Sequence, residues 1–273
     1  MSRCLAKKKH SYKLTTTTRM DTVQQSSVTV FEFHPNETTA YTILSHWWNE
    51  QEVNYDEMVE LVKTEENDEI RQRFGYKVIL GSCEQAKRDG CKWLWVDICC
   101  IDKCSSADLS EVINSTYRWY EKSRVCYAYL HDVRGSSLPV DCWGDRVTTM
   151  DGWVRTRCLV SLTHKMIAPN NVQFFNNDWQ PIGNKRTFSY ILSRITRVPQ
   201  HILRYGLSSN SPCVVQIMLW AANRTTTRVE DGAYSLLGLL DVNMPALYGE
   251  GKKAFHPLQL DIIRTSNDQS IFT

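Results

Sequence analysis

The chain has 273 residues, 42% of them hydrophobic, with 32 basic and 30 acidic side chains. This hydrophobic content is enough for a substantial core, and a net charge of +2 gives no reason to expect nucleic acid or an anionic membrane as a partner. The chain has no run of about 18 apolar residues and no secretory signal, so we expect a soluble protein of the cytoplasm.

The ten cysteines are scattered along the chain. In a long chain without a secretory signal, this scatter favours reduced thiols over a disulfide framework. The one cluster, Cys99, Cys100 and Cys104, lacks the paired C-x-x-C arms and the histidines of a zinc site, so we expect no bound metal ion.

Residues 1–27 are polar and show no periodicity, and the first 20 contain basic but no acidic side chains. This composition predicts a disordered basic tail, with a transit peptide or a nuclear signal as alternatives. Order is expected to begin at the strand-like VTVFEFHP, which Pro35 closes because proline cannot donate to a strand ladder.

Apolar, β-compatible segments then alternate with helical patterns. Strands are predicted at 40–45, 93–99 and 124–133, and helices at 56–63, 76–89 and 105–122. Gly90 stands where a left-handed C-cap would end the second helix, and Ser105 with Asp108 forms a capping-box pattern at the third. The alternation implies right-handed crossovers and a doubly wound parallel sheet.

Polar and aromatic residues follow each predicted strand. Parallel strands carry their carboxyl ends to one edge of the sheet, where such folds bind ligands. The residues predicted at that edge are Ser45, His46, Trp47, Asp97, Asp102, His131 and Asp132. The alternative is structural, because a buried aspartate often accepts hydrogen bonds from loop amides and tryptophans often cover a core.

The pattern weakens after Pro139 and becomes mostly helical towards the C-terminus. We therefore predict a disordered tail over 1–27, an α/β core over 28–170, and a helical extension over 171–273 packed on that core. No internal repeat is present.

Motif tests exclude several enzyme classes. No G-x-G-x-x-G follows a strand, and neither H-E-x-x-H nor G-x-S-x-G occurs. The segment GEGKK is an incomplete phosphate loop, because Ala246 replaces its first glycine and Lys253 its final Ser or Thr.

Four stretches in order resemble the heterokaryon-incompatibility (HET) domain of filamentous fungi, and together they span most of residues 40–256. They are AYTILSHWWNEQEV, GYKVILGSCEQAKRDGCKWLWVDICCIDKCSSADLSEVINSTYRWYEKSRVCYAYLHDV, MIAPNNVQFFNNDWQPIGNK and NRTTTRVEDGAYSLLGLLDVNMPALYGEGKKAF.

The resemblance implies non-self recognition and programmed cell death. It also implies similarity to Toll/interleukin-1 receptor (TIR) domains, whose flavodoxin-like fold agrees with the alternation above. The expected fold class is α/β: a flavodoxin-like, TIR-like parallel sheet flanked by helices, with a mostly helical C-terminal extension. Expected partners are a second copy or other HET or TIR-like signalling domains.

Some TIR domains split nicotinamide from NAD with a catalytic glutamate, so the resemblance makes NAD a candidate substrate, with no resident cofactor. Here Ser45, His46, Trp47, Asp97 and Asp132 would line the ligand site, and Tyr41 and Trp48 would add aromatic surfaces. Family members read similarly to W-T-L-Q-E-L-I-A-P, whereas this chain has Lys165 before MIAP. An ammonium facing a developing cation reverses the required charge, so we expect impaired catalysis.

Two explanations of the altered segment compete. Either this copy has diverged, or residues 159–165 come from a short intron read as coding sequence. An active enzyme would need another acid, for which the candidates are Asp97, Asp102, Glu230 and Glu250. For Glu230 the alternative is a salt-bridged cap with Arg228 and Asp231 that needs no ligand.

Overall fold

A computed structural model of the chain describes residues 11–17, 27–33, 40–63, 68–101, 106–135, 140–143, 146–149, 163–207, 212–222, 226, 228–266, 268 and 270. The chain divides into two compact units, which we describe one at a time. The first comprises residues 1–41 and 50–112, and the second comprises residues 42–49 and 113–273. None of the described helices is both long enough and apolar enough to cross a lipid bilayer.

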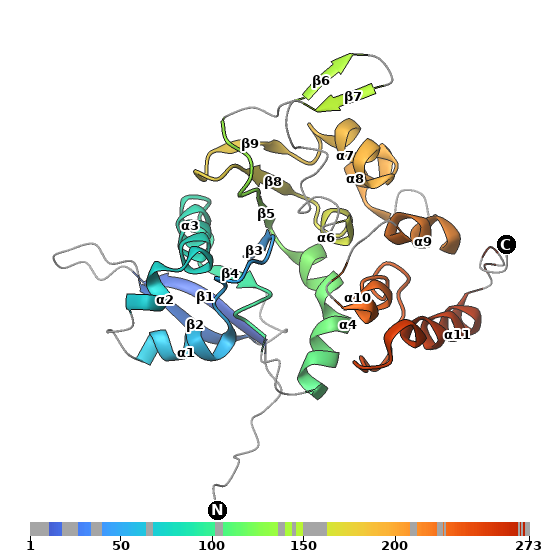
Figure 1. The fold of residues 1–273 in the computed structure, drawn as a ribbon, viewed down its shortest axis with the longest axis horizontal. Helices are drawn as coiled ribbons and strands as arrows, with labels where there is room; N and C mark the ends of the chain where they lie inside the picture. The colour runs from blue at the N-terminus through green and yellow to red at the C-terminus, as the bar shows by residue number, and fades with distance from the viewer. Residues whose placement is uncertain are drawn as a thin grey trace, which may run out of the picture. The chain divides into compact units, whose positions relative to one another are not determined.

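The first unit combines a three-stranded arrangement with helices (Figure 1). Its elements in chain order are β1 (Ser11–Thr17), β2 (Ser27–Phe33), α1 (Tyr55–Lys63), α2 (Asp68–Gln72), α3 (Phe74–Arg88) and β4 (Trp93–Val96). β1 pairs antiparallel with both β2 and β4, and α3 packs against β1 and β4. The buried side of α3 includes Val78, Ile79 and Cys83, which explains its apolar stripe.

The hairpin of β1 and β2 corrects the expectation of a disordered tail. Residues 11–17 lie within the predicted tail, yet they form β1, paired along its whole length from Ser11 opposite Phe33 to Thr17 opposite Ser27. Both segments are rich in β-branched and aromatic residues, which favour strands, and pairing satisfies backbone groups that neither segment can satisfy alone. The strand predicted from VTVFEFHP is confirmed as β2.

The end of α3 follows the predicted capping chemistry. Gly90 has a φ of 70°, its N–H donates to the Lys87 carbonyl at 3.1 Å, and the Cys91 N–H donates to the Ala86 carbonyl at 2.8 Å. Glycine adopts this left-handed conformation without a Cβ clash, so the helix can stop and lead directly into β4. The capping-box pattern of Ser105 and Asp108 lies outside the described side chains.

The second unit contains a mostly parallel sheet in the order β3-β5-β8-β9 and a separate two-stranded ribbon. Its elements are β3 (Tyr41–His46), β5 (Val125–Tyr129), β6 (Val140–Trp143), β7 (Arg146–Thr149), α6 (Thr163–Ile167), β8 (Val172–Phe175), β9 (Pro181–Asn184), α7 (Ser189–Thr196), α8 (Gln200–Tyr205), α9 (Val214–Ala222), α10 (Val229–Tyr234), the 3-10 helix η3 (Gly251–Ala254) and α11 (Phe255–Thr265). The helix α4 (Ser106–Lys122) begins in the first unit and continues into the second.

β5 lies between two parallel neighbours, β3 and β8, whereas β9 pairs antiparallel with β8. Every residue of β3 and β5 is buried, as expected of strands covered on both faces. The fold class is α/β, flavodoxin-like, with a helical C-terminal part, as the sequence predicted.

The sheet extends beyond the boundary that the sequence placed at residue 170. β8 and β9 fall in the stretch for which helices were expected, yet β8 pairs with β5 from Val172 opposite Cys126 to Phe175 opposite Tyr129. Four-residue strands are too short to show a period, so only the pairing partner identifies them.

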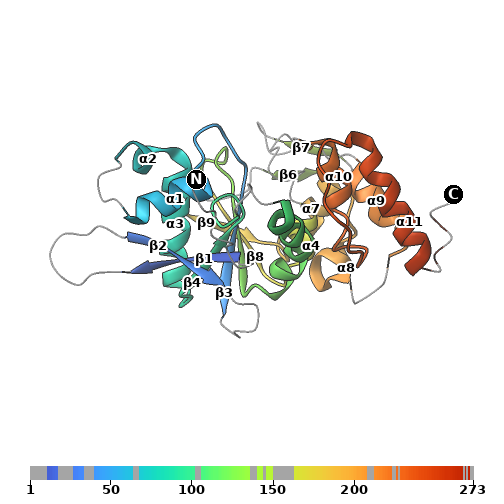
Figure 2. The same cartoon turned by 90° about the horizontal axis from the view of Figure 1, so that it is seen from below.

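The C-terminal helices pack on one another in two groups. α7 contacts α8. α10 contacts both η3 and α11, and α10 and α11 lie side by side in Figure 2. α4 joins the second group, because the Asn114 amide donates to the Met244 carbonyl at 2.9 Å and its oxygen accepts from the Met244 N–H at 3.1 Å. Gly238 also approaches α4 closely: a Cβ at this position would overlap the Cβ of Tyr117.

We expect Gly238→Ala to lower the free energy of unfolding by about 1–3 kcal/mol, because the added methyl group has no space against Tyr117. Gly232→Ala is the matched control: there the nearest atom to a new Cβ is the Phe255 Cζ at 3.4 Å. Since Gly232 lies within α10, the control should leave stability unchanged or raise it by up to about 1 kcal/mol. Urea unfolding followed by circular dichroism measures both, and equal stabilities would contradict the close approach.

Candidate functional site

The carboxyl ends of three parallel strands meet at one edge of the sheet in the second unit. The register places His46 of β3 opposite Tyr129 of β5, and Tyr129 opposite Phe175 of β8. The segments that follow these strands therefore leave the sheet together: Trp47 after β3, residues 130–132 after β5 and residues 176–179 after β8.

Within this edge, burial separates the predicted site residues. Ser45 and His46 are only 1% and 5% exposed, Trp47 is half-buried, and His131 and Asp132 are exposed. The Ser45 hydroxyl has no hydrogen-bond partner among the described residues. A buried hydroxyl without a partner costs about 1–3 kcal/mol, so the Ser45 hydroxyl would gain from a hydrogen-bonding group placed within its reach.

Trp48 and Tyr41, the two other aromatic residues expected near this site, differ in burial. Trp48 is exposed, but Tyr41 is buried at the start of β3, the end opposite to Trp47, and burial raises its pKa to about 12. The two ends of a six-residue strand are separated by roughly 17 Å. Tyr41 is therefore part of the core and not a surface that one nicotinamide could share with Trp47.

An aromatic cluster that the sequence did not single out supports the same edge. Trp179 stacks on Tyr129 at 4.9 Å between ring centroids and lies 5.4 Å from Phe175, which meets Tyr127 edge-on at 5.5 Å. The Tyr129 hydroxyl donates to the Asn177 carbonyl at 3.0 Å. These contacts hold Trp179, which has a left-handed φ of 57°, over the ends of β5 and β8.

Asn176 organises the loop that carries Trp179. Its side-chain oxygen accepts from the N–H groups of Asp178 at 3.0 Å and Gln180 at 2.8 Å, and its amide donates to the Gly135 carbonyl at 2.9 Å. The side chain therefore ties the loop after β8 to the loop after β5. An asparagine directly after a buried strand is the signal that could have predicted this turn.

Asp97 belongs to the first unit, where it directly follows β4 and is 8% exposed. Nearby, the Val96 N–H donates to the Cys100 sulfur at 3.4 Å, and burial raises the pKa of the Cys99 thiol. Raised thiol pKa values are typical of structural rather than reactive cysteines. Asp102 lies outside the described residues.

Six cysteines whose side chains the structure describes are free thiols: Cys83, Cys91, Cys99, Cys100, Cys126 and Cys213. Among the described residues, no group of three or more His, Cys, Asp or Glu side chains is placed to hold a metal ion.

Glu230 lies at the start of α10 and holds a loop of the second unit. One of its carboxylate oxygens accepts from the N–H groups of Gly249 at 2.8 Å and Gly251 at 3.0 Å. Its own backbone N–H, with those of Gly251 and Gly249, holds the pKa of this carboxyl below its usual value. Glu250 lies between the two glycines and is exposed.

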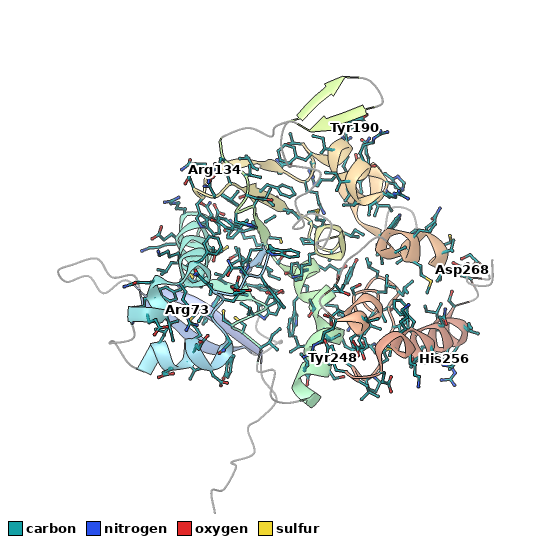
Figure 3. All side chains as sticks on the ribbon, in the orientation of Figure 1. Arg73, Arg134, Tyr190, Tyr248, His256 and Asp268 are labelled. Atoms are coloured by element: carbon teal, nitrogen blue, oxygen red, sulfur yellow. The ribbon has the colours of Figure 1, made fainter. Side chains whose placement is uncertain are left out.

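The side chain of Tyr248, labelled in Figure 3, contacts the other two residues of the predicted cap, Asp231 and Arg228. Its hydroxyl donates to Asp231 at 2.9 Å, and the Arg228 guanidinium lies 4.5 Å from its ring centroid. Arg228 therefore contacts the Tyr248 ring through a cation–π interaction. Because Glu230 and Asp231 already accept hydrogen bonds from this loop, the arrangement has the form of a structural cap.

The helix α6 carries Lys165 at the position where the HET resemblance predicts glutamate. Lys165 is half-buried, and its ammonium nitrogen lies 5.6 Å from the ring centroid of the fully buried Tyr120. The next two residues of α6, Met166 and Ile167, are each 1% exposed. The core therefore fixes the direction of the helix and keeps Lys165 against α4.

A second lysine, to which the sequence assigned no role, anchors the end of this helix. Lys185 is 2% exposed, and its ammonium donates to the carbonyl oxygens of Met166, at 3.1 Å, and of Pro169. Burial lowers the pKa of Lys185 to about 8. One buried cation therefore satisfies two carbonyls at the end of α6.

Residues 41–174 match the family described as Heterokaryon incompatibility protein (HET). The chain is also similar to vegetative incompatibility protein HET-E-1 of Podospora anserina, with 37% identity over 219 residues. The matched region is 78% of this chain but 15% of that relative, so the chain spans a small part of the relative's length. No solved structure matches the chain.

The depressed pKa of Lys185 predicts a specific pH dependence of stability. Between about pH 8 and pH 10.5 the unfolded chain binds a proton at this side chain that the folded chain has released, so the free energy of unfolding should rise with pH in that window. The contribution is about 3 kcal/mol at most. The pH dependence of urea unfolding, compared with that of Lys185→Met, isolates this contribution because methionine does not titrate.

The exposed Lys252→Met serves as the control for this measurement. Its pH profile should run parallel to that of the unmodified chain, whereas the profile of Lys185→Met should diverge from it above pH 8. Parallel profiles for all three proteins would contradict the buried-ammonium description of Lys185.

Proposed function

Because this chain belongs to the heterokaryon incompatibility (HET) family, we propose that it is a cell-death signalling domain of fungal non-self recognition. In this proposal it acts through contacts with other signalling domains, of its own kind or TIR-like, and does not cleave NAD. The observation that carries the proposal is the position of Lys165 on α6.

Cleavage of the bond between nicotinamide and ribose develops positive charge on the ribose, which a carboxylate stabilises, as in glycoside hydrolysis. The ammonium of Lys165 supplies the opposite charge at the position of the expected glutamate. The buried neighbours Met166 and Ile167 and the contact with Tyr120 hold the Lys165 side chain in place. A fixed charge of the wrong sign raises the barrier to such a reaction.

A helix face with exposed apolar side chains supports the role of domain contacts. On α11, Leu260 and Ile263 are 41% and 44% exposed and lie three residues apart, so they share one face. His256, labelled in Figure 3, precedes Leu260 by one turn and is also exposed. Apolar side chains within a polar surround are typical of surfaces that bind another protein.

The second candidate function is a TIR-like NAD glycohydrolase, and the sheet edge of the second unit favours it. Half-buried Trp47 and exposed Asp132 follow neighbouring parallel strands, and the first of these strands carries the buried Ser45 hydroxyl. Of the acids named from the sequence, Glu250 belongs to the same unit as this edge, whereas Asp97 belongs to the first unit. Glu230 is a weaker candidate, because its carboxylate already accepts two backbone hydrogen bonds.

An NAD assay separates the two candidates. We expect no nicotinamide release above the buffer rate from the purified chain, measured by chromatography, and none from Lys165→Gln, which removes the charge. Lys165→Glu restores the expected carboxylate. If one of the three proteins releases nicotinamide, we expect it to be this variant. Release by the unmodified chain would overturn the proposed function, and its loss in Asp132→Asn would then point to the sheet edge.

A cell-death assay tests the proposed contact surface. Expression of the chain in a filamentous fungus should arrest growth, and Leu260→Glu combined with Ile263→Glu should abolish the arrest by placing charge on the apolar face of α11. Gln259→Glu changes an exposed neighbour on the same helix and should leave the arrest intact. Arrest that persists in the double variant at equal protein abundance would exclude this face.

A further inference from the structure

A pocket of about 280 Å³ lies beside α9 in the second unit, and nothing in the proposed signalling role uses it. Its lining residues are Arg197, Gln216, Leu219, Trp220 and Ala222. Arg197 directly follows α7, and the other four residues belong to α9. None of them takes part in the sheet edge, the α6 segment or the apolar face of α11.

The wall of the pocket is apolar because α9 itself is apolar. The helix reads VVQIMLWAA and contains no charged residue. Its side towards the core buries Val214, Ile217 and Trp220, and this anchoring leaves Leu219 59% exposed beside the pocket. A leucine exposed to this extent, next to a tryptophan and an alanine, offers an apolar ligand a surface of fixed shape.

The polar groups at the pocket are hydrogen-bond donors. Arg197 directly follows α7 with a left-handed φ of 61°, and its N–H donates to the Ser193 carbonyl at 2.9 Å. Within the described part of the chain, its guanidinium forms no ion pair. The side-chain oxygen of Gln216 accepts from the Cys213 N–H at 3.3 Å, which leaves the NH₂ group as its contribution to the pocket.

From these features we propose that the pocket binds a small monocarboxylate with an apolar body. The guanidinium of Arg197 and the amide of Gln216 match a carboxylate, because both groups donate and one is cationic. Leu219, Trp220 and Ala222 match a hydrocarbon chain. The volume is close to the lower bound for ligand pockets, so the acid is a small one.

Calorimetric titration of the full chain with butyrate, hexanoate, octanoate and octanamide tests the proposal. Binding should be saturable and should tighten with chain length, by up to about fourfold for each added methylene that the pocket buries. Octanamide keeps the hydrocarbon but lacks the charge, and it should bind roughly fivefold more weakly than octanoate, as expected for a partly exposed charge pair.

Three variants assign the effects to residues. Arg197→Gln should weaken octanoate binding by roughly fivefold and leave octanamide binding unchanged. Leu219→Ser removes apolar wall at an exposed position, so it should reduce the dependence on chain length. Arg134→Gln removes an exposed arginine elsewhere in the same unit, labelled in Figure 3, and should change nothing.

Circular dichroism and thermal unfolding establish that each variant is folded. The proposal is overturned if the folded, unmodified chain shows no saturable binding of octanoate. It is equally overturned if Arg197→Gln binds octanoate as tightly as the unmodified chain does. These outcomes do not depend on the NAD or cell-death assays, since the pocket shares no residue with either test.

Discussion

The parallel pairing of β5 with β3 on one side and β8 on the other is the constraint on which the second unit depends. It aligns the ends of three strands that lie far apart in the sequence, so that Trp47, Asp132 and Trp179 leave the sheet at one edge. The complete burial of β5 makes the pairing costly to disturb, because its backbone groups have no access to water. The hydrogen bonds of Asn176 then join the loops after β5 and β8 and hold both loops in place at this edge.

A second constraint acts on the short helix α6. Lys165 belongs to α6 and Lys185 contacts it, and the two lysines have different roles. Lys185 is buried, and its ammonium donates hydrogen bonds to carbonyl groups at the end of the helix, so its role lies in local structure. Lys165 lies against the ring of Tyr120 and determines the sign of the charge at the position where the family resemblance places a glutamate. The helix is therefore well anchored while carrying a lysine at that position.

Sequence patterns predicted the elements whose signals are local. The helix α3 and its C-cap at Gly90 follow from an apolar stripe and a glycine at the correct spacing, and β3, β4 and β5 follow from continuous apolar runs. The prediction was wrong for residues 11–17, where a polar, threonine-rich stretch becomes a strand by pairing with β2. It also ended the sheet too early, because β8 and β9 are too short to carry a period of their own.

The sequence by itself determined the α/β class, the helical C-terminal part and the family, because these depend on periodicity and on the order of residues along the chain. Only the tertiary structure decided which charged side chains serve the fold. Glu230 is a candidate acid in the sequence but accepts hydrogen bonds from Gly249 and Gly251, and Lys185, to which the sequence assigned no role, lies in the core. Nothing in a linear sequence distinguishes these cases, since the role of a charge depends on its burial and on partners about 20 residues away.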